Sequence, residues 1–202
     1  VKEKSFSELS HFIPKQDEAL QATKQYRFVL YGGSMGSGKS YFLRWACAYW
    51  LLKWFQELRR PGIRAGLFCE DYPALQDRHL SKVRYEFPRE LGSYSEQKHE
   101  FTFHEHLGAG VIAFRNLDDP SKYVSTEFAL IAVDEIARNP KSIFDILRTR
   151  LRWPEIEQTR FIAACNPMGE AWVKHYWVKH LFPPEEEERD QFFYDRALPT
   201  DN

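Results

Sequence analysis

One segment constrains the fold of this chain more than any other. Residues 33–40 read Gly-Ser-Met-Gly-Ser-Gly-Lys-Ser, which matches the phosphate-loop pattern G-x-x-x-x-G-K-[ST] at every position. The context also fits, because residues 27–31 predict a buried strand before the loop and residues 41–58 predict a helix after it. We therefore expect a strand, a phosphate-binding turn and a helix N-terminus that together bind a nucleoside triphosphate.

Each residue type in this loop has a physical role. The glycines let consecutive backbone N–H groups turn inward around phosphate oxygens. The ammonium of Lys39 can reach the β- and γ-phosphates, and the hydroxyl of Ser40 can bind Mg²⁺. A glycine-rich turn that matches by chance is the alternative. The predicted nucleotide-binding residues of the loop are Gly33, Ser34, Met35, Gly36, Ser37, Gly38, Lys39 and Ser40.

A pair of carboxylates follows the apolar run 128–133, which predicts a fully buried parallel strand. Asp134 directly after such a strand lies across from a phosphate loop, where it can hold Mg²⁺. Glu135 can then orient or deprotonate the water that attacks the γ-phosphate. The pair therefore favours hydrolysis over transfer to an acceptor, with an ordinary strand-end turn as the alternative.

Two amide side chains complete the predicted site. Asn166 ends the predicted strand 160–165, where it can sense the γ-phosphate and the attacking water. A common Asn-Pro turn is the alternative there. Gln16 can pair with the N6 and N7 edge of adenine. Taken alone it is better explained as one glutamine on a polar helix face, and the adenine role gains only from its place before the phosphate-loop strand.

Strands and helices alternate along the chain, which predicts a doubly wound sheet with ligands beyond the carboxyl ends of its strands. The remaining predicted elements are a strand at 63–69, helices at 17–23, 73–87, 140–151 and 170–181, and a hairpin over 100–115. The predicted fold class is an α/β P-loop NTPase of the ASCE type. It has three layers, α/β/α, with a mainly parallel central sheet and an inserted hairpin.

Residues 1–182 are predicted to form this ATPase domain, and residues 183–202 an acidic linker or tail that leads to an absent C-terminal domain. The tail is expected to be solvated because it opens with two prolines and four glutamates. A formal net charge of −1 argues against a surface that is basic throughout, so any contact with nucleic acid is local or shared among subunits. No apolar run is long enough to span a bilayer, and no secretory signal is seen, which predicts a cytoplasmic protein.

The order of these motifs resembles the N-terminal ATPase domain of the large terminase subunit of tailed bacteriophages, over nearly the whole chain. Two positions depart from the family pattern: Met35 and Glu70 stand where relatives often have arginine. The segments that carry the resemblance are 14–16 as an adenine motif, 70–77, 114–119, 149–152, 165–167 and 172–174.

The resemblance implies a DNA-packaging motor with ATP and Mg²⁺ as cofactors, acting in the host-cell cytoplasm and on no membrane. Its implied partners are double-stranded DNA, the portal protein and the small terminase subunit. It implies a homo-oligomeric ring during packaging, a monomer for the isolated domain, and a nuclease as the missing C-terminal domain. Because Met35 replaces the loop arginine, another basic residue must stabilise the developing charge. Arg150 is the leading candidate for this arginine finger, Arg148 and Arg152 are the next candidates, and a solvated basic helix end is the alternative.

Two other classes of ATP-binding protein stay open. A helicase or repair ATPase has a related core but usually brings a second motor domain. A small-molecule kinase needs an acceptor pocket and an arginine-rich lid, and Glu135 beside Asp134 fits it poorly. A nuclease domain in the continuation of the gene would favour the terminase, and a phosphorylated acceptor as product would favour the kinase.

Overall fold

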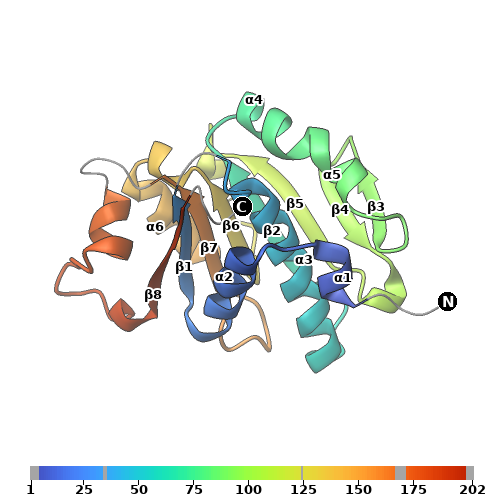
Figure 1. The fold of residues 1–202 in the computed structure, drawn as a ribbon, viewed down its shortest axis with the longest axis horizontal. Coiled ribbons are helices and arrows are strands. Elements are labelled where there is room, and N and C mark those ends of the chain that lie inside the picture. The colour runs from blue at the N-terminus through green and yellow to red at the C-terminus, as the bar shows by residue number, and fades with distance from the viewer. Residues whose placement is uncertain (1–4, 34–35, 124, 167–171, 199–202) are drawn as a thin grey trace.

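The computed structural model describes residues 5–33, 36–123, 125–166 and 172–198. Within them, one eight-stranded sheet has the order β3-β4-β5-β2-β6-β7-β1-β8 (Figure 1). All neighbours from β5 to β8 pair in parallel, whereas β4 pairs antiparallel with both β3 and β5. The predicted parallel sheet with an inserted hairpin is confirmed, and β3 is an additional strand. The strands are β1 Phe28–Gly33, β2 Arg64–Cys69, β3 Gly92–Ser95, β4 Glu100–Phe103, β5 Val111–Asn116, β6 Leu130–Asp134, β7 Arg160–Cys165 and β8 Phe192–Ala197.

Helices cover both faces of the sheet, which gives the three predicted layers (Figure 1). One buried apolar cluster joins the sheet to α2, α3 and α5, and a second lies under α6 and the π-helical turn η5. No described helix has the length and apolar character needed to cross a bilayer. The helices are α1 Phe6–Ser10, α2 Pro14–Gln25, α3 Lys39–Leu58, α4 Tyr72–Leu75, α5 Ser81–Glu86 and α6 Lys141–Arg150; the π-helical turns are η1 Gln76–Leu80 and η5 Lys174–Val178; the 3₁₀ turns are η2 Glu105–Leu107, η3 Pro120–Tyr123, η4 Ile136–Arg138 and η6 Arg189–Gln191.

Helix α3 is apolar over more than one face because it packs on the sheet and is also covered by α1 and α2. The ring of Trp45 meets Phe6 of α1 at 5.8 Å between centroids. Trp50 donates its indole N–H to the hydroxyl of Thr23 in α2 at 3.0 Å. The aromatic residues of α3 therefore belong to the core, and they fix the direction of the helix whose N-terminus follows the phosphate loop.

The register of the parallel strands brings the predicted site residues to one edge of the sheet. Gly32 pairs with Cys165, the last residue of β7, and Asp134 pairs with Ala164. Because the strands are parallel, their carboxyl ends lie at the same edge. The end of β1, the end of β6 and Asn166 directly after β7 therefore share that edge.

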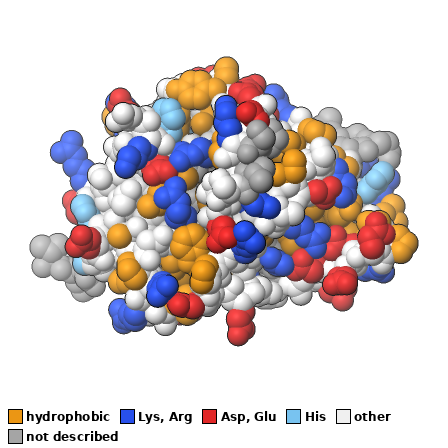
Figure 2. Space-filling model, turned by 180° about the vertical axis from the view of Figure 1, so that it is seen from behind, with side chains coloured by type: hydrophobic (Ala, Val, Ile, Leu, Met, Phe, Trp, Pro, Cys, Tyr) orange, Lys and Arg blue, Asp and Glu red, His pale blue; other side chains and the backbone are white. Residues whose placement is uncertain are grey.

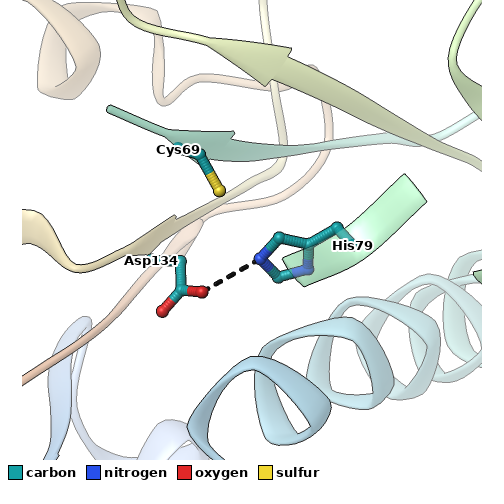
Figure 3. Close-up of side chains that lie close together, drawn as sticks. All are labelled: Cys69, His79 and Asp134. Carbon is teal, nitrogen blue, oxygen red and sulfur yellow. Dashed lines mark hydrogen bonds and ion pairs between the residues drawn. The ribbon is translucent and has the colours of Figure 1, made fainter. Parts of the chain in front are cut away.

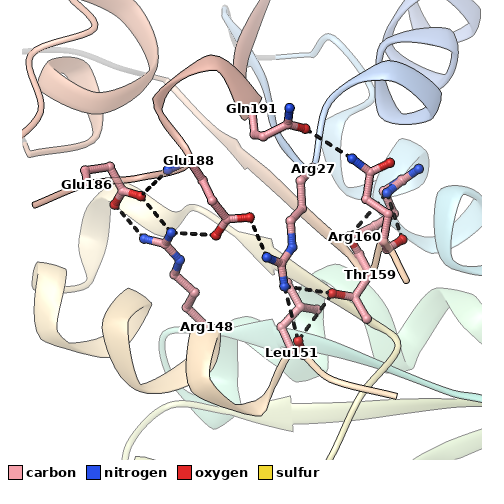
Figure 4. A network of polar contacts seen from close by, with 9 residues as sticks. Arg27, Arg148, Leu151, Thr159, Arg160, Glu186, Glu188 and Gln191 are labelled. Atoms are coloured by element: carbon pink, nitrogen blue, oxygen red, sulfur yellow. Dashed lines mark hydrogen bonds and ion pairs between the residues drawn. The ribbon is translucent and has the colours of Figure 1, made fainter. Parts of the chain in front are cut away.

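The tail is part of the folded domain, so the prediction of a solvated linker from residue 183 is wrong for most of this segment. Strand β8 pairs along the whole length of β1, from Phe28 with Phe192 to Gly33 with Ala197. Ahead of β8, Glu186 is buried and binds the guanidinium of Arg148 (Figure 4). Four successive glutamates indicate a solvated chain, but α6 supplies a cation that pairs with one of them.

Candidate nucleotide-binding site

The phosphate loop connects β1 to α3, as the sequence predicts. Gly36 and Gly38 have φ angles of +85° and +67°, a left-handed conformation that residues with a side chain rarely adopt. Ser37 is buried, and its carbonyl oxygen accepts a hydrogen bond from the Tyr31 hydroxyl at 3.2 Å. A side chain of β1 therefore fixes the backbone of the phosphate loop. The predicted contacts of Ser34 and Met35 fall outside the described residues.

Lys39 and Ser40 begin α3 and face the loop and the sheet respectively. Lys39 Nζ donates to the carbonyl oxygen of Gly33 at 3.4 Å, so the ammonium lies over its own loop. Ser40 Oγ donates to Oδ2 of Asp134 at 2.7 Å, a contact between residues ninety-four positions apart. The phosphate loop and the end of β6 thus meet at one point.

Ser40 and Asp134 form a donor set that fits Mg²⁺. Both offer oxygen, the ligand atom that this ion prefers. Their 2.7 Å separation is close to the roughly 2.9 Å between adjacent oxygens of an octahedron with bonds of about 2.05 Å. The side chain of Asp134 is 1% exposed. Burial opposes its ionisation, yet hydrogen bonds from His79 and Ser40 hold the pKa of Asp134 below its usual value, so it is a carboxylate at neutral pH.

Glu135 differs from its neighbour in backbone and in environment. Its φ of +48° is left-handed, which is uncommon for a residue with a side chain and tends to occur at functional sites. The residue is half-buried. Burial and the adjoining Asp134 raise the pKa of Glu135, while Lys39 and two arginines oppose this shift. Two adjacent carboxylates with opposite pKa shifts suit a metal ligand beside a proton acceptor.

Nothing in the sequence singles out His79, although it contacts Asp134 directly. His79 Nε2 lies 3.1 Å from Asp134 Oδ2, and its Nδ1 lies 3.1 Å from Nη1 of Arg44. Figure 3 shows His79 from η1 and Asp134 from β6 side by side, with Cys69 from β2 next to them. The sequence gives only an indirect signal for a polar contact here: Arg44 lies in a largely apolar helix four residues after Ser40, and so on the same face.

Glu70 gathers two arginines beside the acidic pair. It accepts hydrogen bonds from both terminal nitrogens of Arg78, at 2.8 and 2.7 Å. Nη1 of Arg138 lies 3.1 Å from the same carboxylate. Position 70 therefore holds a carboxylate that binds two arginines from other segments.

The two predicted amides differ in their burial and contacts. Gln16 is 4% exposed and uses both ends of its amide within the protein: Oε1 accepts from the N–H of Ile13 at 3.1 Å, and Nε2 donates to the carbonyl oxygen of Gly38 at 3.2 Å. It braces the loop, and its adenine contact stays a prediction. Asn166 is exposed and directly follows β7, at the same sheet edge as the loop.

Arg150 lies at the opposite edge of the sheet. Its carbonyl oxygen accepts a hydrogen bond from the N–H of Phe128 at 3.0 Å, and the six residue steps from Phe128 to Asp134 span about 20 Å along β6. This is farther than an arginine side chain extends, so Arg150 cannot act on the site of its own chain. Arg148 binds Glu186 and Glu188, and Arg152 lies 2.8 Å from Glu127.

A family model described as "Terminase large subunit, T4likevirus-type, N-terminal" matches residues 30–201. A search of curated proteins gives no significant match.

Solved structures share the fold at low sequence identity. The large terminase of a thermophilic bacteriophage is 15% identical with a TM-score of 0.72, covering 93% of this chain and 45% of that one. Its complex with ATP-γ-S is 17% identical with a TM-score of 0.69, covering 95% of this chain and 46% of that one. The ATPase domain of the Thermus phage P74-26 large terminase is 16% identical with a TM-score of 0.58, covering 97% of this chain and 84% of that one. The Hef helicase domain of Pyrococcus furiosus is 13% identical with a TM-score of 0.55, covering 95% of this chain and 39% of that one. This chain thus spans less than half the length of the first relative.

Proposed function

Because the chain belongs to the large terminase subunit family, as its N-terminal ATPase domain, we propose that it hydrolyses ATP with bound Mg²⁺ to move double-stranded DNA into a viral procapsid. The observation that carries this proposal is the 2.7 Å contact between Ser40 Oγ and Asp134 Oδ2. This contact joins the phosphate loop to Asp134 at the end of β6. A bound triphosphate needs the loop for its phosphates and the carboxylate for its metal ion.

The residues of the site divide the chemistry of hydrolysis between them. The loop N–H groups and Lys39 bind the phosphates, while Ser40 and Asp134 hold Mg²⁺. Bound Mg²⁺ would neutralise charge on the β- and γ-phosphate oxygens. Glu135, whose raised pKa suits proton acceptance, orients the attacking water and takes its proton. Asn166 contacts the γ-phosphate from the end of β7.

The arginine finger is proposed to come from a neighbouring copy of the chain. Arg150 lies about 20 Å from the acidic pair of its own subunit, at the far edge of the sheet. In a homo-oligomeric ring it can face the phosphate loop of the next subunit. Such a finger contributes roughly 10³–10⁵ in rate, so the isolated domain should hydrolyse ATP slowly.

DNA and the other packaging components are proposed as partners on the strength of the family. Figure 2 shows cationic and anionic side chains interspersed over one face of the molecule, in keeping with a net charge of −1. DNA contacts are therefore local or shared around a ring. The portal protein, the small terminase subunit and a C-terminal nuclease domain complete the proposed machine in the host cytoplasm.

Two substitutions separate nucleotide binding from hydrolysis. Lys39→Ala should abolish binding of ATP-γ-S, because the loop loses its phosphate-binding cation. Glu135→Ala should bind ATP-γ-S like the parent but release no phosphate, because it removes only the carboxylate that positions water. Calorimetric titration and a phosphate-release assay measure the two steps. Parental hydrolysis by Glu135→Ala would overturn the role of that residue, and lack of ATP binding by the parent would overturn the proposal.

A DNA-dependent helicase or repair ATPase is the alternative, because the Hef helicase domain shares the fold. The family match over residues 30–201 favours the terminase. A strand-unwinding assay distinguishes the two, since a packaging motor moves duplex DNA without separating its strands.

A further inference from the structure

His79 is buried between a cation and the proposed metal ligand, and this fixes its protonation. Arg44 Nη1 can only donate a hydrogen bond, so the Nδ1 atom of His79, 3.1 Å away, must be the acceptor. In a neutral ring the proton then lies on Nε2, which faces Asp134 Oδ2 at 3.1 Å. A ring nitrogen that accepts a hydrogen bond carries no proton, so the contact with Arg44 means that the ring is neutral. His79 is therefore a neutral donor to the carboxylate.

Arg44 is itself held in one position. Its Nε and Nη2 bind the two oxygens of Glu86 in α5, at 2.9 and 2.5 Å. Its Nη1 also donates to the carbonyl oxygen of Arg78 at 2.7 Å, and the residue is 4% exposed. Because Arg44 stands one helical turn after Ser40, α3 carries both the metal-binding hydroxyl and the group that orients His79.

The π-helical turn η1 brings His79 to this place. A π-helical turn widens the helix by one residue and so changes which side chains face inward, and such turns are frequent at functional sites. Here η1 separates α4 from α5, and His79 within it is fully buried against β6. Its neighbour Arg78 turns to Glu70 instead.

We infer that His79, oriented by Arg44, is a positioning residue that holds Asp134 in the geometry needed to bind Mg²⁺. This rests on the proposed function. Asp134 Oδ2 receives hydrogen bonds from Ser40 and from His79. Ser40 is a candidate metal ligand and exchanges its partner when the metal binds, whereas His79 keeps the carboxylate in place throughout. Loss of such an outer contact typically costs 10–100-fold in metal affinity.

The same side chains do not make a second metal site. Cys69, His79 and Asp134 offer ligand atoms within 4.8 Å of one another. The histidine nitrogen that faces Asp134 carries the proton, however, and burial raises the pKa of the Cys69 thiol, so the sulfur stays protonated. A metal at this point would have to displace two protons and break the contact with Asp134.

The test compares His79→Leu, which removes both hydrogen bonds, with His79→Gln, which keeps a donor and an acceptor. Binding of Mn²⁺, as a spectroscopic probe for Mg²⁺, to the protein–ADP complex is measured by electron paramagnetic resonance. We expect His79→Leu to weaken Mn²⁺ binding 10–100-fold and His79→Gln to restore most of it. Affinity for ADP in EDTA should match the parent, because no phosphate contact is lost. His106→Leu, at an exposed histidine, is the matched control.

The outcomes separate this inference from the proposed function. If the parent protein with ADP binds no Mn²⁺, the proposed nucleotide site is wrong. If the parent binds Mn²⁺ and His79→Leu binds it equally well, only the role of His79 is wrong. Should His79→Leu not fold, Arg44→Lys keeps the charge but loses the planar group that spans Glu86 and His79. An unchanged Mn²⁺ affinity in a folded Arg44→Lys protein would overturn the inference.

Discussion

Replacing Glu186 with glutamine is expected to destabilise the whole domain. This carboxylate is 8% exposed and accepts hydrogen bonds from Nη1 and Nη2 of Arg148 at 2.6 and 2.7 Å. The guanidinium of Arg148 in turn lies 4.9 Å from the ring centre of Phe28 in β1. The ion pair therefore joins the segment before β8 to α6 and to β1, the neighbour of the edge strand β8.

The size of the effect follows from the contacts that glutamine cannot make. Glu186→Gln keeps one acceptor oxygen but turns the other into an NH₂ group that faces a donor. A hydrogen bond to a charged group contributes roughly 1.5–3 kcal/mol. Arg148 retains Glu188 as a second partner at 2.6 Å, so we expect a loss of about 2 kcal/mol. For a domain of this size the melting temperature should fall by about 4–8 °C.

The difference in the free energy of unfolding between the parent and Glu186→Gln should depend on pH. Hydrogen bonds from Arg148 hold the pKa of Glu186 below its usual value, so the folded state binds a proton there less readily than the unfolded state. The stabilisation is complete above the unfolded-state pKa and is lost as pH falls through the lowered folded-state pKa. The gap in the free energy of unfolding should be largest near neutral pH and close on acidification.

Urea unfolding followed by tryptophan fluorescence at several pH values measures this gap. Glu187→Gln is the matched control, because it makes the same change at the next, exposed residue and should shift stability by less than about 0.5 kcal/mol. Equal midpoints for the two variants, or a gap that persists in acid, would refute the reasoning.

Three further predictions concern the nucleotide site. A Cβ added at Gly33 would lie 1.7 Å from the carbonyl oxygen of Ala197. Gly33→Ala should therefore lower both the melting temperature and the affinity for ATP-γ-S, and a variant with the parental melting temperature and affinity would contradict this. Ser40→Ala should weaken ADP binding about tenfold or more with Mg²⁺ and leave it unchanged in EDTA, measured with fluorescent ADP. Arg150→Ala subunits mixed with the parent should lower ATPase activity more than in proportion to their share, and a linear decrease would exclude a finger acting between subunits.

The phosphate loop, the buried strands and the mainly parallel character of the sheet could be predicted because their signals are local. Gly33 to Ser40 form one uninterrupted motif, and Asp134 follows a short apolar run that is typical of a buried strand. Their convergence followed from a general rule, that parallel strands bring their carboxyl ends to one edge.

The features that escaped prediction depend on contacts between distant residues. Strand β8 alternates weakly, with a buried pattern typical of an edge strand, and it is stabilised by pairing with β1, more than 150 residues away. His79 faces inward only because a π-helical turn changes the helical phase after α4. Glu186 is buried only because Arg148 reaches it from α6. No local window of sequence contains both partners of these contacts.

The pairing of Gly33 with Ala197 gives the last strand a mechanical role. The backbone that begins the phosphate loop touches the backbone by which the chain leaves the sheet, with no side chain between them to absorb a displacement. A displacement of Gly33 would therefore have to be accompanied by a displacement of Ala197 in β8. Gly33 at the start of the loop and Ala197 at the end of β8 are thus in direct main-chain contact.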